Sequence, residues 1–337
     1  MKVGIDAISY ALPEAVLTNA ELGENYPHWN MDRLAERTGV QSRHIAGDGE
    51  TALDLTMRAC QALTSTGDLE KGEIDAVIFC TETPDYPLPP NACLLHGRLG
   101  LGTEVAAFDI NLACSGYIYG LELARSLIVS GSARKVLLAT GDTYTRLIHP
   151  EDRATRCLFG DGAAVSLISA AQDSSGFIDI KLGTSGQNHE RFIVRAGGAR
   201  MPRGAETRQE VSDRSGNIRS AENIEMDGLG VLSFFNSTVP PHVLDTLSRN
   251  GLSVPDVDLF VFHQASKVAL DSLQRQLKIA DENMLVALSE VGNLVSASIP
   301  VAFQQAIEGG RVSSGNLIAF CGFGVGLSWG TALLRMK

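Results

Sequence analysis

The chain has 337 residues, of which 44% are hydrophobic and 20% charged, and its formal net charge is −11. This is globular composition, and the length favours two domains or two packed halves. Because the charge is acidic and no run of Lys and Arg occurs, we expect neither a nucleic-acid partner nor binding to an anionic membrane surface. No stretch approaches the roughly 18 apolar residues of a spanning helix, and the N-terminus does not resemble a secretory signal.

The cysteines indicate neither disulfides nor a metal. They form no C-x-x-C pair, and no Cys/His spacing suggests zinc, so we expect no metal site and no cofactor. They are typical of reduced cysteines in a cytoplasmic protein, which is the location we expect. The six are Cys60, Cys80, Cys93, Cys114, Cys157 and Cys321.

Hydrophobic periodicity predicts an alternation of strands and helices. A helix is expected over 51–66, a buried strand over 105–108, and a helix that follows Cys114 and ends at Gly131. Residues 201–225 are polar and charged, and they are typical of a mobile surface loop or flap. Two more helices are expected over 240–250 and 267–279.

Cys114 therefore lies at a predicted strand-to-helix turn, at the N-terminus of the helix. There the helix dipole favours negative charge, which predicts a lowered thiol pKa and a nucleophilic thiolate. The alternative on this stretch alone is a small buried core cysteine.

Three pairs of similar segments suggest an internal repeat. They recur in the same order at about 170 to 185 residues, which predicts two copies of one α/β unit. We place the halves at 1–172 and 173–337, with the border in the small and polar stretch 170–176. The paired segments are 75–80 with 258–263, 135–141 with 316–322, and 159–165 with 328–334.

The repeat gives two further residues a reason to meet Cys114. His263 ends a predicted buried strand, and Asn293 lies just before the predicted helix start that corresponds to that of Cys114. If the halves pack about a pseudo-twofold axis, the three side chains converge on one buried point. Taken singly, His263 is better interpreted as a core histidine and Asn293 as a helix cap.

The chain resembles the thiolase-fold β-ketoacyl–acyl-carrier-protein synthase III family over nearly its whole length. The resemblance implies an α/β fold of two similar halves related by a pseudo-twofold axis, layered α-β-α-β-α, and a homodimer. Its seven matching stretches are 12–19, 37–46, 109–117, 152–163, 262–265, 292–300 and 322–330.

The resemblance also implies a reaction and a catalytic set. Cys114 would take an acyl group from an acyl thioester, acyl-coenzyme A or acyl-carrier protein, and a malonyl-carrier protein would then lose carbon dioxide and condense with it. His263 and Asn293 would donate hydrogen bonds to the enolate oxygen, and the N–H groups of Cys114 and Val325 would form an oxyanion hole. The family usually has Gly at position 325, so the Val is a departure from its pattern.

The substrate-binding residues come from the same resemblance. Arg37, Arg153 and Ser266 match positions that bind coenzyme A or phosphopantetheine. Leu88 matches a residue that closes the partner's acyl pocket, and Phe323 is assigned to the acyl pocket as well. Departures from the family pattern indicate a specialised rather than a housekeeping member: Arg33 in place of a tryptophan that stacks on adenine, Ser233 in place of a lysine, Ser266 in place of an asparagine, and Val268 in place of a docking arginine.

Two alternatives stay open. The protein could transfer an acyl group from Cys114 to an alcohol or amine without condensation, or it could be a non-catalytic partner subunit. Release of carbon dioxide from malonyl-carrier protein distinguishes condensation from simple acyl transfer. An acyl adduct on Cys114 distinguishes both of these enzymes from a non-catalytic partner subunit.

Overall fold

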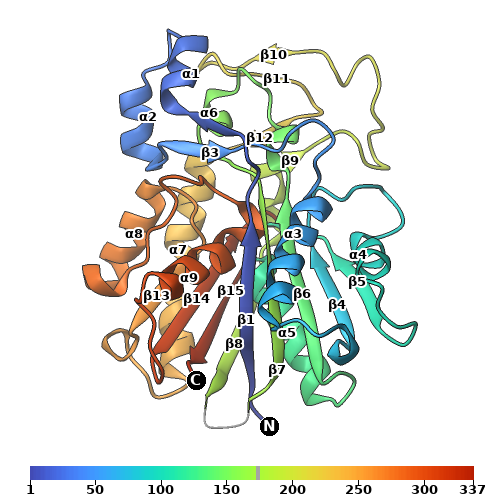
Figure 1. The fold of residues 1–337 in the computed structure, drawn as a ribbon. Coiled ribbons are helices and arrows are strands. Elements are labelled where there is room, and N and C mark those ends of the chain that lie inside the picture. The colour runs from blue at the N-terminus through green and yellow to red at the C-terminus, as the bar shows by residue number, and fades with distance from the viewer. Residues whose placement is uncertain (172–174) are drawn as a thin grey trace.

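Two β-sheets stand side by side in the structure, a computed structural model that describes residues 1–171 and 175–337 (Figure 1). The strands of the first sheet, in spatial order, are β1 (Val3–Ala11), β7 (Gly162–Ala170), β6 (Lys135–Asp142), β4 (Ala76–Cys80) and β5 (Ala106–Ile110). Those of the second are β8 (Gly176–Thr184), β15 (Ser328–Arg335), β14 (Leu317–Gly324) and β13 (Leu259–Phe262).

The two sheets share one pattern of pairing, as the repeat predicts. In the first, β4 runs parallel to β6, β6 antiparallel to β7, and β7 antiparallel to β1. In the second, β13, β14, β15 and β8 repeat these relations in the same order. The place of β5 is taken in the second half by a single parallel bridge between Phe260 and Met284. The predicted border at 172 and 173 lies outside the described residues.

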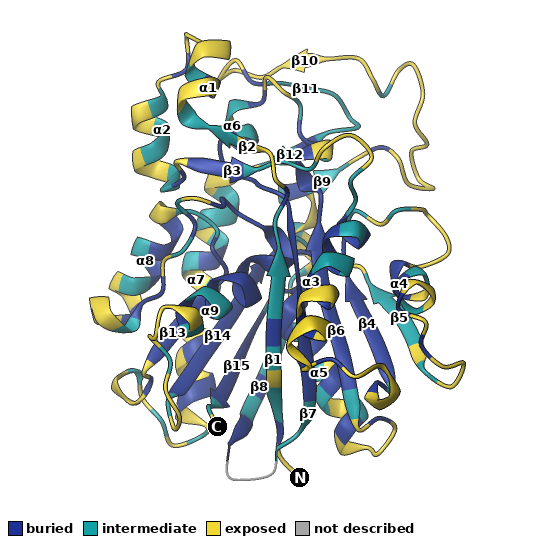
Figure 2. Ribbon diagram, in the orientation of Figure 1, coloured by how far each residue is buried: buried dark blue, intermediate teal, exposed yellow. Residues whose placement is uncertain are grey.

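Helices fill the space between the sheets and cover their outer faces. α5 (Gly116–Val129) contacts β4, β6 and β7 on one side and β8, β14 and β15 on the other, and α9 (Ser298–Glu308) also contacts both sheets. α3 (Ala52–Thr66) and α4 (Asn91–Leu99) cover the first sheet, while α7 (Gly228–Ser248) and α8 (Lys267–Leu277) cover the second. The central strands β4, β6, β13 and β14 are almost wholly buried, whereas the outer helices expose one face (Figure 2). These layers give the predicted α-β-α-β-α architecture.

The first turn of α5 lies directly against β4 because residue 116 is a glycine. A Cβ at Gly116 would be 2.1 Å from Cys80 Sγ, which no side chain tolerates. The remaining helix is apolar on most of its surface, with Tyr117, Ile118, Leu121 and Ala124 fully buried, as expected for a helix enclosed by two sheets.

Three predicted helices agree with the structure and one begins in the wrong place. The helix at 51–66 is α3, that at 267–279 is α8, and that after Cys114 is α5. The helix predicted over 240–250 is α7, which already begins at Gly228 and passes through Pro240 and Pro241. Its buried residues recur four apart across the prolines, so packing on the second sheet keeps the helix continuous; they include Phe235, Val239, Val243 and Leu247.

The strand predicted over 105–108 is present as β5, but the expectation that it is buried is wrong. β5 is the last strand of the first sheet, so one of its edges has no neighbouring strand among the described residues. Its residues are exposed or only partly buried for this reason.

A cap covers the carboxyl ends of the parallel strands at the top of Figure 1. It consists of β2 (Val16–Thr18), α1 (Asn19–Asn25), α2 (Met31–Thr38), β3 (Ser42–His44), α6 (Arg153–Arg156), β9 (Phe192–Val194), β10 (Val211–Ser212), β11 (Ile218–Arg219) and β12 (Ile224–Met226). Short 3-10 helices complete the fold: η1 (Lys71–Glu73), η2 (Tyr144–Leu147), η3 (Gly186–Arg191), η4 (Val254–Asp256), η5 (Asp281–Asn283) and η6 (Val295–Ala297).

The predicted flap at 201–225 is built into this cap. It forms the β10–β11 hairpin, and β12 pairs with β9. The hairpin is docked on the start of α6, where Ile218 N–H donates to Glu151 O at 3.4 Å and Arg219 lies 3.6 Å from the Asp152 carboxylate.

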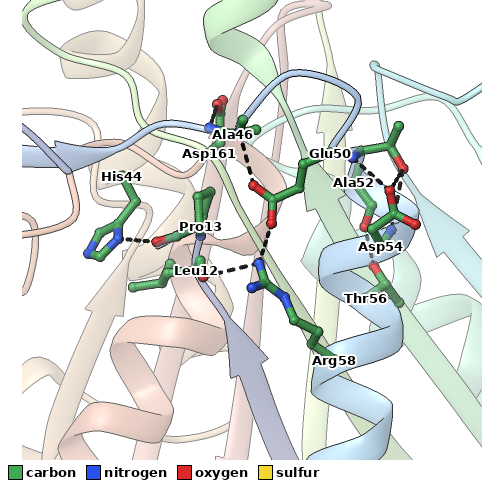
Figure 3. A network of polar contacts seen from close by, with 12 residues as sticks. Leu12, Pro13, His44, Ala46, Glu50, Ala52, Asp54, Thr56, Arg58 and Asp161 are labelled. Atoms are coloured by element: carbon green, nitrogen blue, oxygen red, sulfur yellow. Dashed lines mark hydrogen bonds and ion pairs between the residues drawn. The ribbon is translucent and has the colours of Figure 1, made fainter. Parts of the chain in front are cut away.

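Polar contacts fasten the segment that follows β3 of the cap to the first half, and Figure 3 shows those of Ala46, Glu50 and Arg58. Asp161 accepts the Ala46 N–H at 2.8 Å and the Thr145 hydroxyl at 2.6 Å. Close by, Arg58 donates to Glu50 at 2.6 Å. The first two contacts account for the Asp at position 161 of the motif 159–163.

Within the described ranges, none of the helices has the length and hydropathy that crossing a bilayer requires.

Candidate active site

The site is formed where parallel strands of both sheets end beneath the cap. Cys114 follows β5 and immediately precedes Ser115, the N-cap residue of α5, as predicted. His263 directly follows β13, and its N–H donates to Cys321 O of β14 at 2.8 Å. Since parallel strands end at one edge of a sheet, these residues are carried to the same end of the molecule.

Cys114 is held against β14 of the other half. Its exposed fraction is 3%, and a Cβ at Gly324 would be 2.5 Å from Cys114 Cβ and 2.9 Å from Sγ. Next to it, the Ser115 and Ser328 hydroxyls hydrogen-bond at 2.7 Å. Only a glycine at 324 allows the nucleophile candidate to lie on this strand.

The thiol pKa differs from the prediction. Burial raises the pKa of Cys114 well above its usual value, and the nearby carboxyls of Glu82 and Asp142 raise it further. The N–H groups of Cys114 and Val325 hydrogen-bond the sulfur and lower the pKa, but they do not compensate. The prediction of a lowered pKa from the helix start is therefore wrong, because burial and the two carboxyls outweigh the two N–H groups at the sulfur.

The same two N–H groups are those predicted for the oxyanion hole. Both lie at the Cys114 sulfur, where a thioester carbonyl oxygen would also be within reach of donors. The Val side chain at position 325 leaves this N–H available.

His263 is a neutral imidazole. Its exposed fraction is 2%, and burial lowers its pKa to about 3. The ring stands edge-on to Phe323 at a centroid distance of 5.6 Å. Its Nδ1 is enclosed and makes no hydrogen bond with any residue that the structure describes. A neutral imidazole can donate one hydrogen bond without bringing a charge.

The Asn293 amide is oriented by its own backbone neighbours. Its Oδ1 accepts the Val295 N–H at 2.9 Å, so Nδ2 points away from η6 and toward Ala265 O at 3.4 Å. Ala265 lies two residues after His263, which places the amide beside the histidine segment. The second hydrogen of Nδ2 is available to a substrate oxygen. Val295 itself adopts φ 54°, a strained conformation for a β-branched residue.

Cys114, His263 and Asn293 are thus brought together around β14. Cys114 contacts Gly324, His263 packs on Phe323, and Asn293 reaches the segment that follows His263. The arrangement offers a sulfur nucleophile with donors for two oxyanions, one formed by N–H groups and one by side chains.

The three residues predicted to bind coenzyme A or phosphopantetheine lie in or next to the cap. Arg37 is exposed in the last turn of α2, which contacts α8. Ser266 is the N-cap of α8, and its Oγ accepts the Ala269 N–H at 3.3 Å. Arg153 begins α6 and donates to Ser215 O at 3.4 Å.

The tryptophan nearest the expected adenine position is not free to stack on a ligand. Trp29 is buried and stacks on Tyr26 with ring centroids 4.2 Å apart. Arg33, which occupies the expected position, is exposed on α2.

A cavity of about 1030 Å³ lies beside the Cys114 loop and is lined by Asn111, Tyr144, Phe192 and Val325, among others. Neither residue predicted for the acyl pocket lines it. Phe323 is buried between His263 and Phe235, and Leu88 is 81% exposed on the loop after β4, where it faces outward.

Sequence reasoning missed three polar residues next to Cys114. Glu82 follows β4, Asp142 ends β6, and Tyr144 follows in η2. Tyr144 donates to Glu82 at 2.6 Å, and Asp142 accepts from the Glu82 N–H at 2.8 Å and from the Ser296 hydroxyl at 2.5 Å. Their signal was available, because polar residues that directly follow buried strands are the pattern that singled out His263.

Comparison with known proteins gives consistent matches. The family model for 3-oxoacyl-[acyl-carrier-protein] synthase III matches residues 108–186, and the model for its C-terminal domain matches 247–336. The chain is 35% identical to a β-ketoacyl-[acyl-carrier-protein] synthase III of Campylobacter concisus over 99% of this chain and 97% of that protein.

Solved structures agree. A crystal structure of a 3-oxoacyl-(acyl-carrier-protein) synthase III superposes with a TM-score of 0.97 at 39% identity and covers 100% of both chains. The synthase of Burkholderia xenovorans has a TM-score of 0.92 at 31% identity and covers 100% of this chain and 95% of that one.

Proposed function

This chain belongs to the 3-oxoacyl-[acyl-carrier-protein] synthase III family and is a condensing enzyme of the acyltransferase class, and from that premise we propose that Cys114 carries the primer acyl group. The substrates we propose are an acyl-coenzyme A or acyl-carrier protein as primer and a malonyl-carrier protein as extender. The product is a 3-oxoacyl thioester on the carrier protein.

In the first step, Cys114 Sγ attacks the carbonyl carbon of the primer thioester. A new thioester forms on the sulfur, and the leaving thiol departs with the proton that Cys114 gives up. The raised pKa of Cys114 means that the resting thiol is protonated, so acylation and proton transfer to the leaving group are coupled. The N–H groups of Cys114 and Val325 stabilise the oxyanion.

In the second step, the malonyl group loses carbon dioxide. The electron pair of the broken carbon–carbon bond forms an enolate, whose oxygen accepts hydrogen bonds from neutral His263 and from Asn293 Nδ2. The enolate carbon attacks the acyl carbonyl on Cys114, the new carbon–carbon bond forms as the carbon–sulfur bond breaks, and Cys114 leaves as a thiolate that takes up one proton from water. None of these steps changes an oxidation state that would call for a redox cofactor, and we propose that the enzyme uses none.

The observation that supports this proposal best is the pair of N–H groups at the Cys114 sulfur. Cys114 and the neutral His263 both pack against β14. The test is acylation of Cys114, read as mass added to the intact protein, together with carbon dioxide released from malonyl-carrier protein. Cys114→Ala should lose the adduct, while Cys93→Ala, which removes an exposed cysteine, should keep it. Acylation without carbon dioxide release would favour transfer to an alcohol or amine, and no adduct in the wild type would favour a non-catalytic subunit.

We propose further that the enzyme is a specialised member of the family that prefers primers on a carrier protein. Buried Trp29 and exposed Arg33 support this, because neither gives an adenine ring the expected aromatic surface. Comparing the acylation rates with coenzyme A and carrier-protein thioesters of one acyl group tests it.

A homodimer is the assembly that we propose. It is supported by the outer edge of β5, which pairs with no other strand in the part of the chain that the structure describes, and by Leu88, an apolar side chain that is 81% exposed on the neighbouring loop. Light scattering of wild type and Leu88→Asp measures the oligomeric state. The six free cysteines support a cytoplasmic location.

A further inference from the structure

Glu82 places a carboxyl group inside the cavity next to Cys114. The residue is partly buried and lines the cavity together with Tyr144 and Val325. Val325 is the residue whose N–H hydrogen-bonds the Cys114 sulfur, and the Glu82 carboxyl is near enough to raise the pKa of that thiol, so the cavity wall adjoins the reacting residue. An acyl chain on Cys114 that extends into the cavity would pass the Glu82 carboxyl.

Only one oxygen of the Glu82 carboxyl accepts a hydrogen bond from a described residue. Oε2 accepts a hydrogen bond from Tyr144 Oη at 2.6 Å, and the Tyr144 ring is fixed between Phe159 and Phe192 at centroid distances of 5.4 and 6.4 Å. Across the described residues, Oε1 accepts no hydrogen bond and no Lys, Arg or His forms an ion pair with Glu82. The backbone is fixed as well, because Glu82 N–H donates to Asp142.

The Glu82 carboxyl would make binding of an unsubstituted alkyl chain less favourable in free energy. The chain would remove water from Oε1 and give it no partner, and an unsatisfied buried polar group costs about 1–3 kcal/mol, more when it is charged. Much of the surrounding wall is apolar and includes Phe192, Val194 and Ile224. A chain that carries a hydrogen-bond donor at the level of Oε1 avoids this cost.

We propose that Glu82, held by Tyr144, is a specificity-determining residue that accepts a hydrogen bond from a hydroxyl or ammonium group on the primer acyl chain. The inference rests on the proposed function and deepens it, since it names the class of primer. The group does not take part in bond making, and its effect is on which acyl thioester reacts with Cys114.

The experiment compares acylation of Cys114 by four thioesters of equal chain length: butyryl, 3-hydroxybutyryl, 3-aminobutyryl and 3-oxobutyryl. Rates are read as mass added to the intact protein. A site that satisfies a buried polar group rejects the analogue that lacks it, so we expect the hydroxy or the amino substrate to react at least about 100-fold faster than butyryl. The hydroxy and amino arms show which donor is used.

Variants assign the preference to Glu82. Glu82→Leu should lose it and favour butyryl, while Glu82→Gln, which keeps the volume, should retain folding and part of the preference. Tyr144→Phe should weaken the preference, because it frees the carboxyl that Tyr144 holds. Glu104→Leu removes an exposed carboxylate outside the cavity and should leave the preference unchanged. Thermal unfolding confirms that each variant is folded.

The outcomes separate the two proposals. If no thioester acylates wild-type Cys114, the proposed function fails. If butyryl reacts as fast as the substituted primers, or if Glu82→Leu and wild type rank the primers alike, the role of Glu82 is wrong and the proposed function stands. A preference for 3-oxobutyryl that Glu82→Leu abolishes would also overturn the inference, because Glu82 would then be a donor.

Discussion

Gly324 of β14 lies so close to Cys114 that a Cβ at position 324 would be 2.5 Å from the Cβ of the cysteine. The contact joins the two halves of the fold at the nucleophile candidate. Real side chains essentially never approach to this distance, so one of the two segments must shift if residue 324 acquires a side chain.

Gly324→Ala should therefore displace Cys114 from its donors. We expect acylation of Cys114 to fall by about 100-fold or more, since misplacing a reacting group by an ångström has effects of this size. Overpacking should lower the free energy of unfolding by about 1–3 kcal/mol. Gly47→Ala is the matched control, because a Cβ at Gly47 meets nothing within 4 Å. Equal acylation rates in the two variants would contradict the prediction.

His263 should make stability depend on pH. Its pKa is lowered to about 3 in the fold, whereas an unfolded histidine has its ordinary value near 6.5. Between these values the unfolded chain binds a proton that the folded protein does not, so stability falls as pH falls below 6.5 and this contribution is constant above it. Urea unfolding at pH 7.5 and pH 5 should show wild type losing about 1–2 kcal/mol more than His263→Asn.

The control for this experiment is His28→Asn, which removes an exposed histidine. Its loss of stability between the two pH values should equal that of wild type. If His263→Asn behaves in the same way as His28→Asn, the imidazole is not buried as a neutral group.

Asp142 should hold back the reactivity of Cys114. Burial raises the pKa of Asp142 to about 7, and its charge raises the pKa of the Cys114 thiol. Asp142→Asn removes that charge, so the pH profile of iodoacetamide modification at Cys114 should move to lower pH, and the rate at pH 8 should rise several-fold. A profile that stays in place or moves to higher pH would contradict the assigned charge effect.

The N-cap of α3 should contribute to stability. Thr51 Oγ accepts the Asp54 N–H at 3.3 Å, Asp54 accepts the Thr51 N–H at 3.0 Å, and Thr51 also donates to Asp85 at 3.2 Å. Thr51→Ala should lower the free energy of unfolding by about 1–2 kcal/mol. Chemical denaturation measures this, and Ser65→Ala, in the exposed last turn of the same helix, should cost less.

The sequence was sufficient for features that depend on periodicity and order. The strands that repeat between the halves, and helices α3, α5 and α8, were predictable from the spacing of apolar residues. Cys114, His263 and Asn293 could be named because each lies at the end of a predicted strand or the start of a predicted helix. The family resemblance supplied their roles, which stay predictions until tested.

What could not be predicted depends on packing between distant segments. α7 continues through Pro240 and Pro241 because its buried face lies on the second sheet, which local propensity does not reveal. The thiol pKa was predicted in the wrong direction because a helix start is visible in a sequence, whereas burial and a facing Glu82 are not. Phe323 was assigned to the acyl pocket, yet its strand turns the ring toward His263.

β14 also has a consequence for how the enzyme can move. Gly324 supports the nucleophile candidate, Phe323 supports the imidazole, and Cys321 holds the His263 backbone, all within one strand paired on both sides. A hinge between the halves would break this strand away from Cys114. We therefore expect adjustment to different substrates in the cap and the loops around the cavity, while β14 supports both Cys114 and His263.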